Sequence, residues 1–178
     1  MNPTPTADSL FDQFPASKSR PFTTPISPDS IPEPYRSLLV HTVHMTVTVE
    51  EFYGGAVDVR VLETVHCGSE YSRKILLLLR ESGRVVQFGL VQIDLDSLSK
   101  KVRGEILAGQ TPLGRVLIQN DVLRDIHPAG YLKVELDAEL TRQFGLRSPV
   151  TTYGRLGVIS TDGQPAIEVL EILAPVDT

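Results

Sequence analysis

The chain has 178 residues, of which 17 are Lys or Arg and 22 are Asp or Glu, so its formal net charge is −5. The basic residues are scattered and lack interleaved aromatic residues, which argues against a nucleic-acid partner. A single cysteine excludes an internal disulfide, and the longest apolar run, Ile75 to Leu79, is too short to span a bilayer. We expect a soluble cytoplasmic protein with no membrane span.

The N-terminal part of the chain is rich in proline, with eight of the 13 prolines in the first 34 residues. Proline fixes φ and removes a backbone donor, so this composition disfavours helices and ladders. We predict an irregular arm over residues 1–30 and one folded domain over residues 31–178. Three apolar side chains could anchor the arm to that domain, namely Leu10, Phe11 and Phe14.

The first periodic segment follows this arm. Apolar residues between Glu33 and Thr42 recur at helical spacing and predict an amphipathic helix. Residues 46–53 are ambiguous, because Val47 and Val49 alternate with threonines like a strand, while the following Glu-Glu-Phe could close a helical turn. Propensity leaves both interpretations open.

Alternating apolar residues predict several strands after Gly54-Gly55. The expected strands cover residues 57–65, 71–79, 84–93, 122–136 with a break near Pro128, 151–160 and 165–174. Turn signals at Ser82-Gly83 and Thr161 to Gln164 predict hairpins. Most connections are short, so the sheet should be mainly antiparallel, with helices packed on one face, in an α+β fold.

Three further helices are expected between these strands. Asp94 or Asp96 could cap a helix that continues through Ile106 and ends at Gly109. Thr111-Pro112 has the form of an N-cap followed by proline at the first helical position, and this predicts a short helix over residues 113–118. A third short helix is expected over residues 138–144.

Familiar catalytic and cofactor motifs are absent from the sequence, including GxSxG, the P-loop, a dinucleotide-binding GxGxxG and CxxC. His41 and His44 have the spacing of ligands on one helical face, but no third ligand follows in a regular pattern. We therefore expect no metal site here.

Three elements could form a pocket for a small acid. Arg73 shares a strand face with Ile75 and Leu77, so its guanidinium should point inward, where it needs an anionic partner. Glu171 occupies a similar position in an apolar strand, and burial would raise its pKa and suit it to proton transfer. The segment Thr111 to Arg115 would contribute free backbone amides at a helix start.

The chain resembles chorismate pyruvate-lyases (4-hydroxybenzoate synthases), specifically a divergent lyase-like branch of that family. The resemblance covers roughly residues 35–175 and rests on six segments: His44-Met45-Thr46, Ser72 to Leu77, Thr111 to Arg115, Tyr153-Gly154-Arg155, Gly163-Gln164-Pro165 and Leu170 to Pro175. It implies a six-stranded antiparallel sheet carrying helices, and a helix over residues 46–53. Spacing back from Pro175 selects Glu171 as the family glutamate, whereas spacing forward from Gly163 falls one residue short.

The resemblance implies elimination of pyruvate from chorismate to give 4-hydroxybenzoate, without a cofactor. Arg73 and Glu171 are the expected catalytic residues. Met45 and Leu113 would bind the substrate, Leu113 through its backbone amide. The second carboxylate of chorismate needs another cation, for which Arg155 and Arg115 are the candidates.

Two other hypotheses compete with the hypothesis that the chain is an enzyme. The first is a non-catalytic sensor of an aromatic or carboxylate ligand, because effector domains of some bacterial transcription regulators share this fold. Those domains normally follow a winged-helix domain, which the short polar arm does not provide. The second is a scaffold protein with a vestigial pocket. The chain also has Gly89-Leu90 where the better-known branch has arginine after glycine, so a different product isomer stays open.

Overall fold

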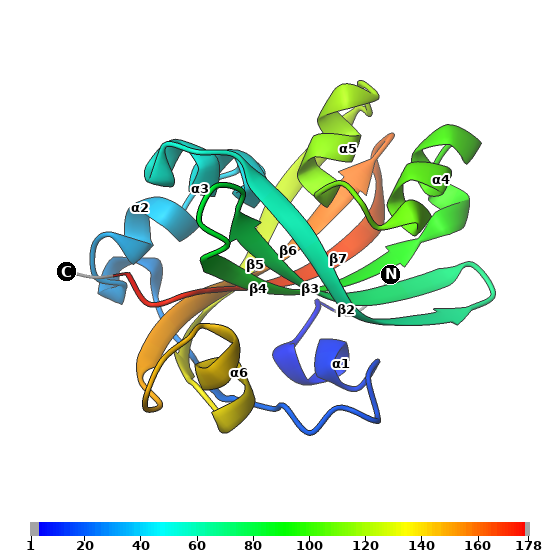
Figure 1. The fold of residues 1–178 in the computed structure, drawn as a ribbon. Coiled ribbons are helices and arrows are strands. Elements are labelled where there is room, and N and C mark those ends of the chain that lie inside the picture. The colour runs from blue at the N-terminus through cyan, green and yellow to red at the C-terminus, as the bar shows by residue number, and fades with distance from the viewer. Residues whose placement is uncertain (1–3, 177–178) are drawn as a thin grey trace.

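The computed structural model describes residues 4–176 of the chain (Figure 1). Within these residues, seven strands form one sheet, and all neighbouring strands are antiparallel. Their order across the sheet is β1-β5-β6-β7-β4-β3-β2. The strands are β1 (Phe22–Pro25), β2 (Val57–Cys67), β3 (Glu70–Leu79), β4 (Val85–Asp94), β5 (Arg124–Glu135), β6 (Thr151–Thr161) and β7 (Gln164–Leu173).

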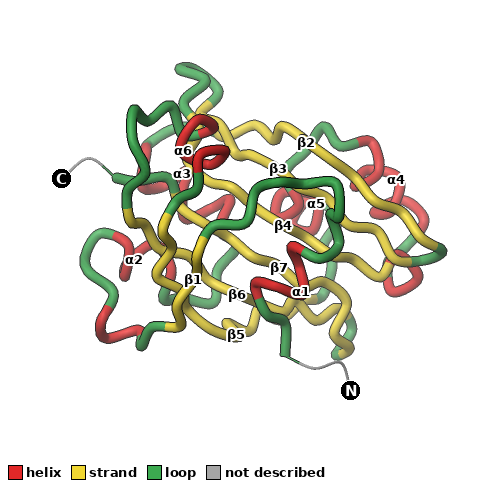
Figure 2. The backbone as a smooth tube through the Cα atoms, turned by 90° about the horizontal axis from the view of Figure 1, so that it is seen from below, coloured by secondary structure: helices red, strands yellow, loops and turns green. Residues whose placement is uncertain are grey.

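Helices cover both faces of the sheet (Figures 1 and 2). One face carries α2 (Tyr35–Leu39), α3 (Met45–Tyr53), α4 (Lys100–Ala108) and α5 (Leu113–Gln119), and the other carries α1 (Ala7–Phe11) and α6 (Ala138–Gln143). Two single 3₁₀ turns are η1 (Pro28–Ser30) and η2 (Leu95–Ser97). The predicted α+β class with an antiparallel sheet is confirmed. It differs from the expectation by a seventh strand and by the helices on the second face.

The second helical layer exists because alternation along the central strands makes both sheet faces apolar. In β4, Phe88 and Leu90 face α1, whereas Val91 and Ile93 face the opposite layer. A strand buried on both faces needs cover on both. The core is therefore divided by the sheet into one cluster under α1 and α6 and two clusters under the other helices.

The N-terminal segment that was expected to be irregular contains α1 and β1. A capping box between Thr6 and Ser9 starts α1, which satisfies two amides at the start of a very short helix. The expected anchors Leu10, Phe11 and Phe14 are buried in the core cluster that lies between the sheet and the helices α1 and α6. β1 then pairs with β5 and adds the seventh strand at the edge of the sheet.

The ambiguous segment 46–53 is helical, as the family resemblance implied. Met45 and Val49 are both fully buried and lie one helical turn apart, so packing overrides the strand preference of the β-branched residues. Gly54 closes α3 in the left-handed region at φ 68°, a conformation that glycine adopts without strain.

The expected caps of the next two helices need correction. Asp94 caps only the single turn η2, and Ser99 starts α4 by accepting a hydrogen bond from the amide of Val102. The predicted end at Gly109 is confirmed. Thr111 does not cap α5, which begins at Leu113 with Pro112 in the N-cap position.

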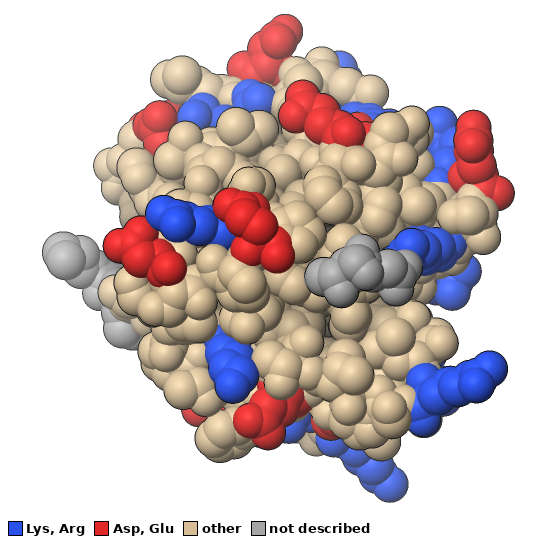
Figure 3. Space-filling view, turned by 90° about the vertical axis from the view of Figure 1, so that its left-hand side faces the viewer, with Lys and Arg blue, Asp and Glu red and all other residues tan. Residues whose placement is uncertain are grey.

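Acidic and basic side chains are interspersed over most of the molecular face drawn in Figure 3, and Lys and Arg side chains gather toward its lower right edge. Among the described residues, no helix is long and apolar enough to cross a membrane. The same part of the chain contains no group of three or more His, Cys, Asp or Glu side chains placed to hold a metal ion.

Candidate functional site

An enclosed cavity of about 50 Å³ lies between the sheet and the starts of α3 and α5. We call it the enclosed cavity. Its lining consists of Val59, Arg73, Ile75, Leu77, Gln87, Gly89, Val91, Ile159, Val169 and Glu171 from the sheet, and His44, Met45, Thr46, Leu113 and Gly114 from the helical layer. A volume of this size accommodates about four water molecules, which occupy about 120 Å³ in the liquid.

The register of the sheet explains the floor of this cavity. Arg73 on β3 lies opposite Val91 on β4, and Ile75 lies opposite Gly89. Gly89 in turn lies opposite Glu171 on β7. Side chains two residues apart share a face, so these positions all point toward α3 and α5. The predicted inward orientation of Arg73 and Glu171 therefore follows from β alternation.

Two helix starts approach each other above this floor at Gly114. A Cβ atom at Gly114 would lie 3.0 Å from Cβ of His44 and 3.0 Å from Oγ1 of Thr46. Glycine is thus the residue that lets the first turn of α5 touch the first turn of α3. The turn Thr111 to Arg115 acts here by close packing.

Arg73 is a buried cation with little compensation. Its side chain is 1% exposed, and its one hydrogen bond runs from Nη1 to the carbonyl oxygen of Ile106 at 3.4 Å. Within residues 4–176, its Nε atom has no hydrogen-bond partner, and no carboxylate forms an ion pair with it. Burial lowers the pKa of Arg73 from its usual value.

Glu171 does not serve as that partner, because it pairs with Arg155. Nε of Arg155 donates to Oε2 of Glu171 at 2.6 Å, and the two residues lie directly opposite each other on β6 and β7. Arg155 is 3% exposed and the Glu171 side chain is 15% exposed. The two charges therefore compensate each other at the edge of the cavity.

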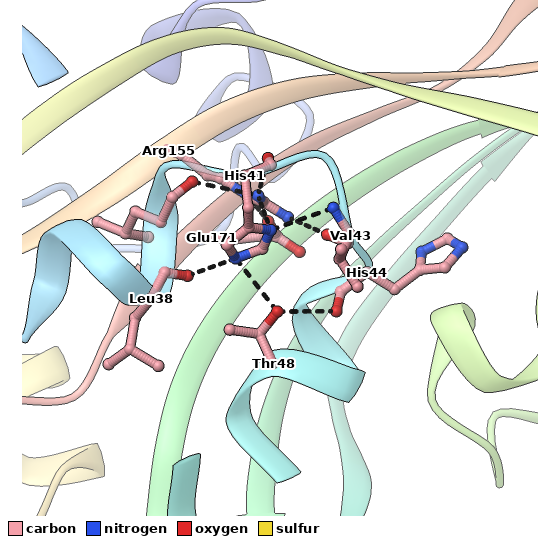
Figure 4. Close-up of polar contacts among 8 residues, drawn as sticks. Leu38, His41, Val43, His44, Thr48, Arg155 and Glu171 are labelled. Atoms are coloured by element: carbon pink, nitrogen blue, oxygen red, sulfur yellow. Dashed lines mark hydrogen bonds and ion pairs between the residues drawn. The ribbon is translucent and has the colours of Figure 1, made fainter. Parts of the chain in front are cut away.

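Arg155 also holds the loop between α2 and α3, as Figure 4 shows. Its Nη1 donates to the carbonyl oxygens of Leu39 at 3.3 Å and His41 at 3.1 Å, and its Nη2 donates to that of Val43 at 3.2 Å. The guanidinium thus satisfies backbone acceptors that have no helix or strand to pair with. This fixes the entry of the chain into α3.

The two histidines of this loop have different surroundings. His41 bonds through Nε2 to the carbonyl of Leu38 and contacts Arg155 through Nδ1, and burial followed by the charge of Arg155 lowers its pKa. His44 points away from this cluster (Figure 4), and its Nε2 accepts a hydrogen bond from Nε of Arg124 at 2.6 Å. Burial, then the charges of Arg124 and Arg155, lowers the pKa of His44 to about 4. Both imidazoles are therefore neutral near pH 7, and of the two only His44 lines the enclosed cavity.

The structure brings four of the six expected site residues to one cavity, namely Arg73, Glu171, Met45 and Leu113. Arg155 adjoins it through Glu171 but is absent from its lining. Arg115 lies outside the lining, and its guanidinium pairs with Glu50.

Gln87 and Gly89 line the cavity and were not among the expected site residues. The sequence contained a signal for Gln87, because an amide at an inward position of an otherwise apolar strand is costly to bury unless it binds a partner. Gly89 was noted only as a departure from the family pattern.

An open surface groove of about 770 Å³ lies beyond His44, between the α2–α3 loop and the start of β5. Arg124 lines this groove, and its guanidinium already donates hydrogen bonds to His44 and to the carbonyl oxygen of Val122.

No protein-family model and no curated protein sequence matches this chain. Solved structures match it at low identity. The effector domain of PhnF from Mycobacterium smegmatis is 12% identical with a TM-score of 0.49, over 74% of this chain and 88% of that chain. A GntR-family transcriptional regulator from Bacillus cereus is 10% identical with a TM-score of 0.46, over 68% and 96% of the chains. The gene product SA0254 from Staphylococcus aureus is 10% identical with a TM-score of 0.49, over 66% and 82%.

The expected carbon–oxygen lyase activity is contradicted by these comparisons. Three of the matched structures are named as possible, putative or GntR-family transcriptional regulators rather than as enzymes. The geometry is consistent with this correction, because Glu171, expected to move a proton, is held in an ion pair by Arg155. What remains of the expected resemblance is the architecture of an antiparallel sheet with helices.

Proposed function

We propose that the chain is a non-catalytic domain that senses a small carboxylate ligand in the enclosed cavity. The observation that carries this proposal is Arg73, whose guanidinium lines the cavity, is 1% exposed and has no anionic partner among the described residues. Burying a charge without a partner lowers the stability of the fold by several kcal/mol, and binding of an anion would offset this cost.

The surroundings of Arg73 favour an organic acid over an inorganic ion. Apolar side chains form most of the wall, including Ile75, Leu77, Val91 and Met45. A carboxylate can meet the two edges of a guanidinium with two parallel hydrogen bonds, while its carbon skeleton fills the apolar space. The free Nε of Arg73 supports this side-on geometry.

The charge on the opposite side of the cavity limits the ligand to one anionic group. Glu171 is already neutralised by Arg155, and the remaining donors of Arg155 bond to the loop carbonyls. A second carboxylate on the ligand would meet no further free cation in the lining. Monocarboxylates are therefore the expected class.

Thermal shift and isothermal titration with benzoate, 4-hydroxybenzoate and a short aliphatic acid test this proposal. At least one acid should raise the melting temperature of the wild-type protein, and Arg73→Gln should abolish the shift. Arg60→Gln is the matched control, because Arg60 lies exposed on β2 and away from the cavity lining. Equal loss in both variants, binding of none of the acids, or release of pyruvate from added chorismate would contradict the sensor.

A further inference from the structure

Gln87 is a second polar group buried in the enclosed cavity without a partner. It is 3% exposed, and its Oε1 atom makes no hydrogen bond within the described residues. A buried amide oxygen that loses water without gaining a donor costs about 1 to 3 kcal/mol. Gln87 lines the same cavity as Arg73. The cavity therefore presents two unmet hydrogen-bonding groups, one cationic and one neutral.

These two groups stand at opposite ends of the cavity floor. Gln87 lies opposite Leu77 on β3, whereas Arg73 lies opposite Val91, four residues further along β4. Four residues of a strand span about 13 Å between backbone positions. Gly89 lies midway and has no side chain, and the atoms nearest to a Cβ there would belong to Ile75. The side chain of Ile75 therefore lies against Gly89, and the middle of the floor is apolar.

From this arrangement we propose that Gln87 selects the ligand by binding a hydroxyl group at the end remote from its carboxylate. This inference rests on the proposed carboxylate site at Arg73. The ligand class that satisfies both ends is a hydroxy-substituted monocarboxylic acid with an apolar middle. A hydroxyl both donates and accepts, so it pairs with a glutamine amide in either orientation.

The alternative partner for such a hydroxyl is Glu171, which the family resemblance implied. Its position on β7 is opposite Gly89, beside the middle of the floor, and Arg155 already donates to its Oε2. Gln87 has no such competitor. The neutral amide also sets the charge preference, because a second carboxylate at this end would lose its hydration without meeting a cation.

The test compares 4-hydroxybenzoate and 3-hydroxybenzoate with benzoate by isothermal titration. The wild-type protein should bind the better hydroxybenzoate about 10- to 100-fold more tightly than benzoate, the range expected when a buried polar group is left unpaired. Gln87→Leu should reduce this ratio to within about threefold, and its circular dichroism spectrum and cooperative thermal melt show whether the variant is folded.

Gln92→Leu is the matched control, because Gln92 lies on the same strand but on the opposite face. It should keep the wild-type ratio. The role of Gln87 would be overturned if the wild-type protein bound hydroxybenzoate and benzoate equally well, or if Gln87→Leu kept the wild-type ratio of these affinities. The proposed carboxylate site would still hold in either case, provided that binding depended on Arg73. Failure of these three acids and of the short aliphatic acid to bind would overturn both.

Discussion

Replacing Arg73 with methionine should make the unliganded protein more stable. The substitution removes a guanidinium that is 1% exposed and has only a 3.4 Å hydrogen bond to the carbonyl of Ile106. Exchange of buried charges for apolar side chains of similar length is neutral or stabilising by about 1 to 4 kcal/mol. For a chain of this size, a gain of about 2 kcal/mol raises the melting temperature by about 4 to 8 °C.

Arg155→Met is the matched comparison, because Arg155 is equally buried on the same sheet face but fully engaged. Its loss leaves the carboxylate of Glu171 unpaired and the carbonyls of Leu39, His41 and Val43 without their donor. Removal of one member of a buried pair costs about 3 to 5 kcal/mol. The two substitutions should therefore shift stability in opposite directions.

Urea unfolding followed by circular dichroism, with calorimetric melting in ligand-free buffer, measures both differences. If Arg73→Met lowers stability by an amount similar to Arg155→Met, the guanidinium of Arg73 is compensated inside the fold. The reasoning that assigns it to a ligand would then be refuted. A stabilised Arg73→Met protein that no longer responds to carboxylates is the expected result.

Two further predictions concern the cover of the enclosed cavity. Because the pKa of His44 is lowered to about 4, the unfolded chain binds its proton first, so stability falls as pH drops from about 6.5 to about 4, by about 3 kcal/mol in total. Urea unfolding at pH 7 and 4.5 should show a flatter profile for His44→Gln, and an unchanged profile would contradict the assignment. Gly114→Ala should destabilise by about 1 kcal/mol, because its Cβ would lie 3.0 Å from His44 and Thr46. Gly104→Ala in α4, where nothing lies within 4 Å, should instead stabilise by about 1 kcal/mol in the same melts.

Strand alternation was sufficient to predict β2 to β7, because each carries an inward apolar series and most are joined by short turns. β1 could not be predicted in the same way. Its four residues end in proline, and all four are exposed or half-buried, so nothing local distinguishes Phe22–Pro25 from a loop. Only pairing with β5 makes it a strand. A short edge strand of this kind depends on tertiary contacts.

The pairing of Arg155 with Glu171 could not be predicted from the sequence either, because it depends on a β-bulge that shifts the register between β6 and β7. Thr161 pairs with Gln164 at the hairpin turn, and continuing that register would place Arg155 opposite Leu170. The ladder shifts by one residue between Ile159 and Ser160, which brings Arg155 opposite Glu171. One extra residue reverses the face that a side chain meets.

The contrast between the two buried arginines supports the proposed ligand site at Arg73. Arg155 is surrounded by acceptors that belong to the fold, so its burial is explained by structure. Arg73 and Gln87 carry hydrogen-bonding atoms that the described residues leave unmet, and both line one small cavity. Local conflicts with stability are expected at functional sites, where a ligand resolves them. Two such conflicts at opposite ends of one cavity are the basis for proposing a ligand with two unlike polar ends.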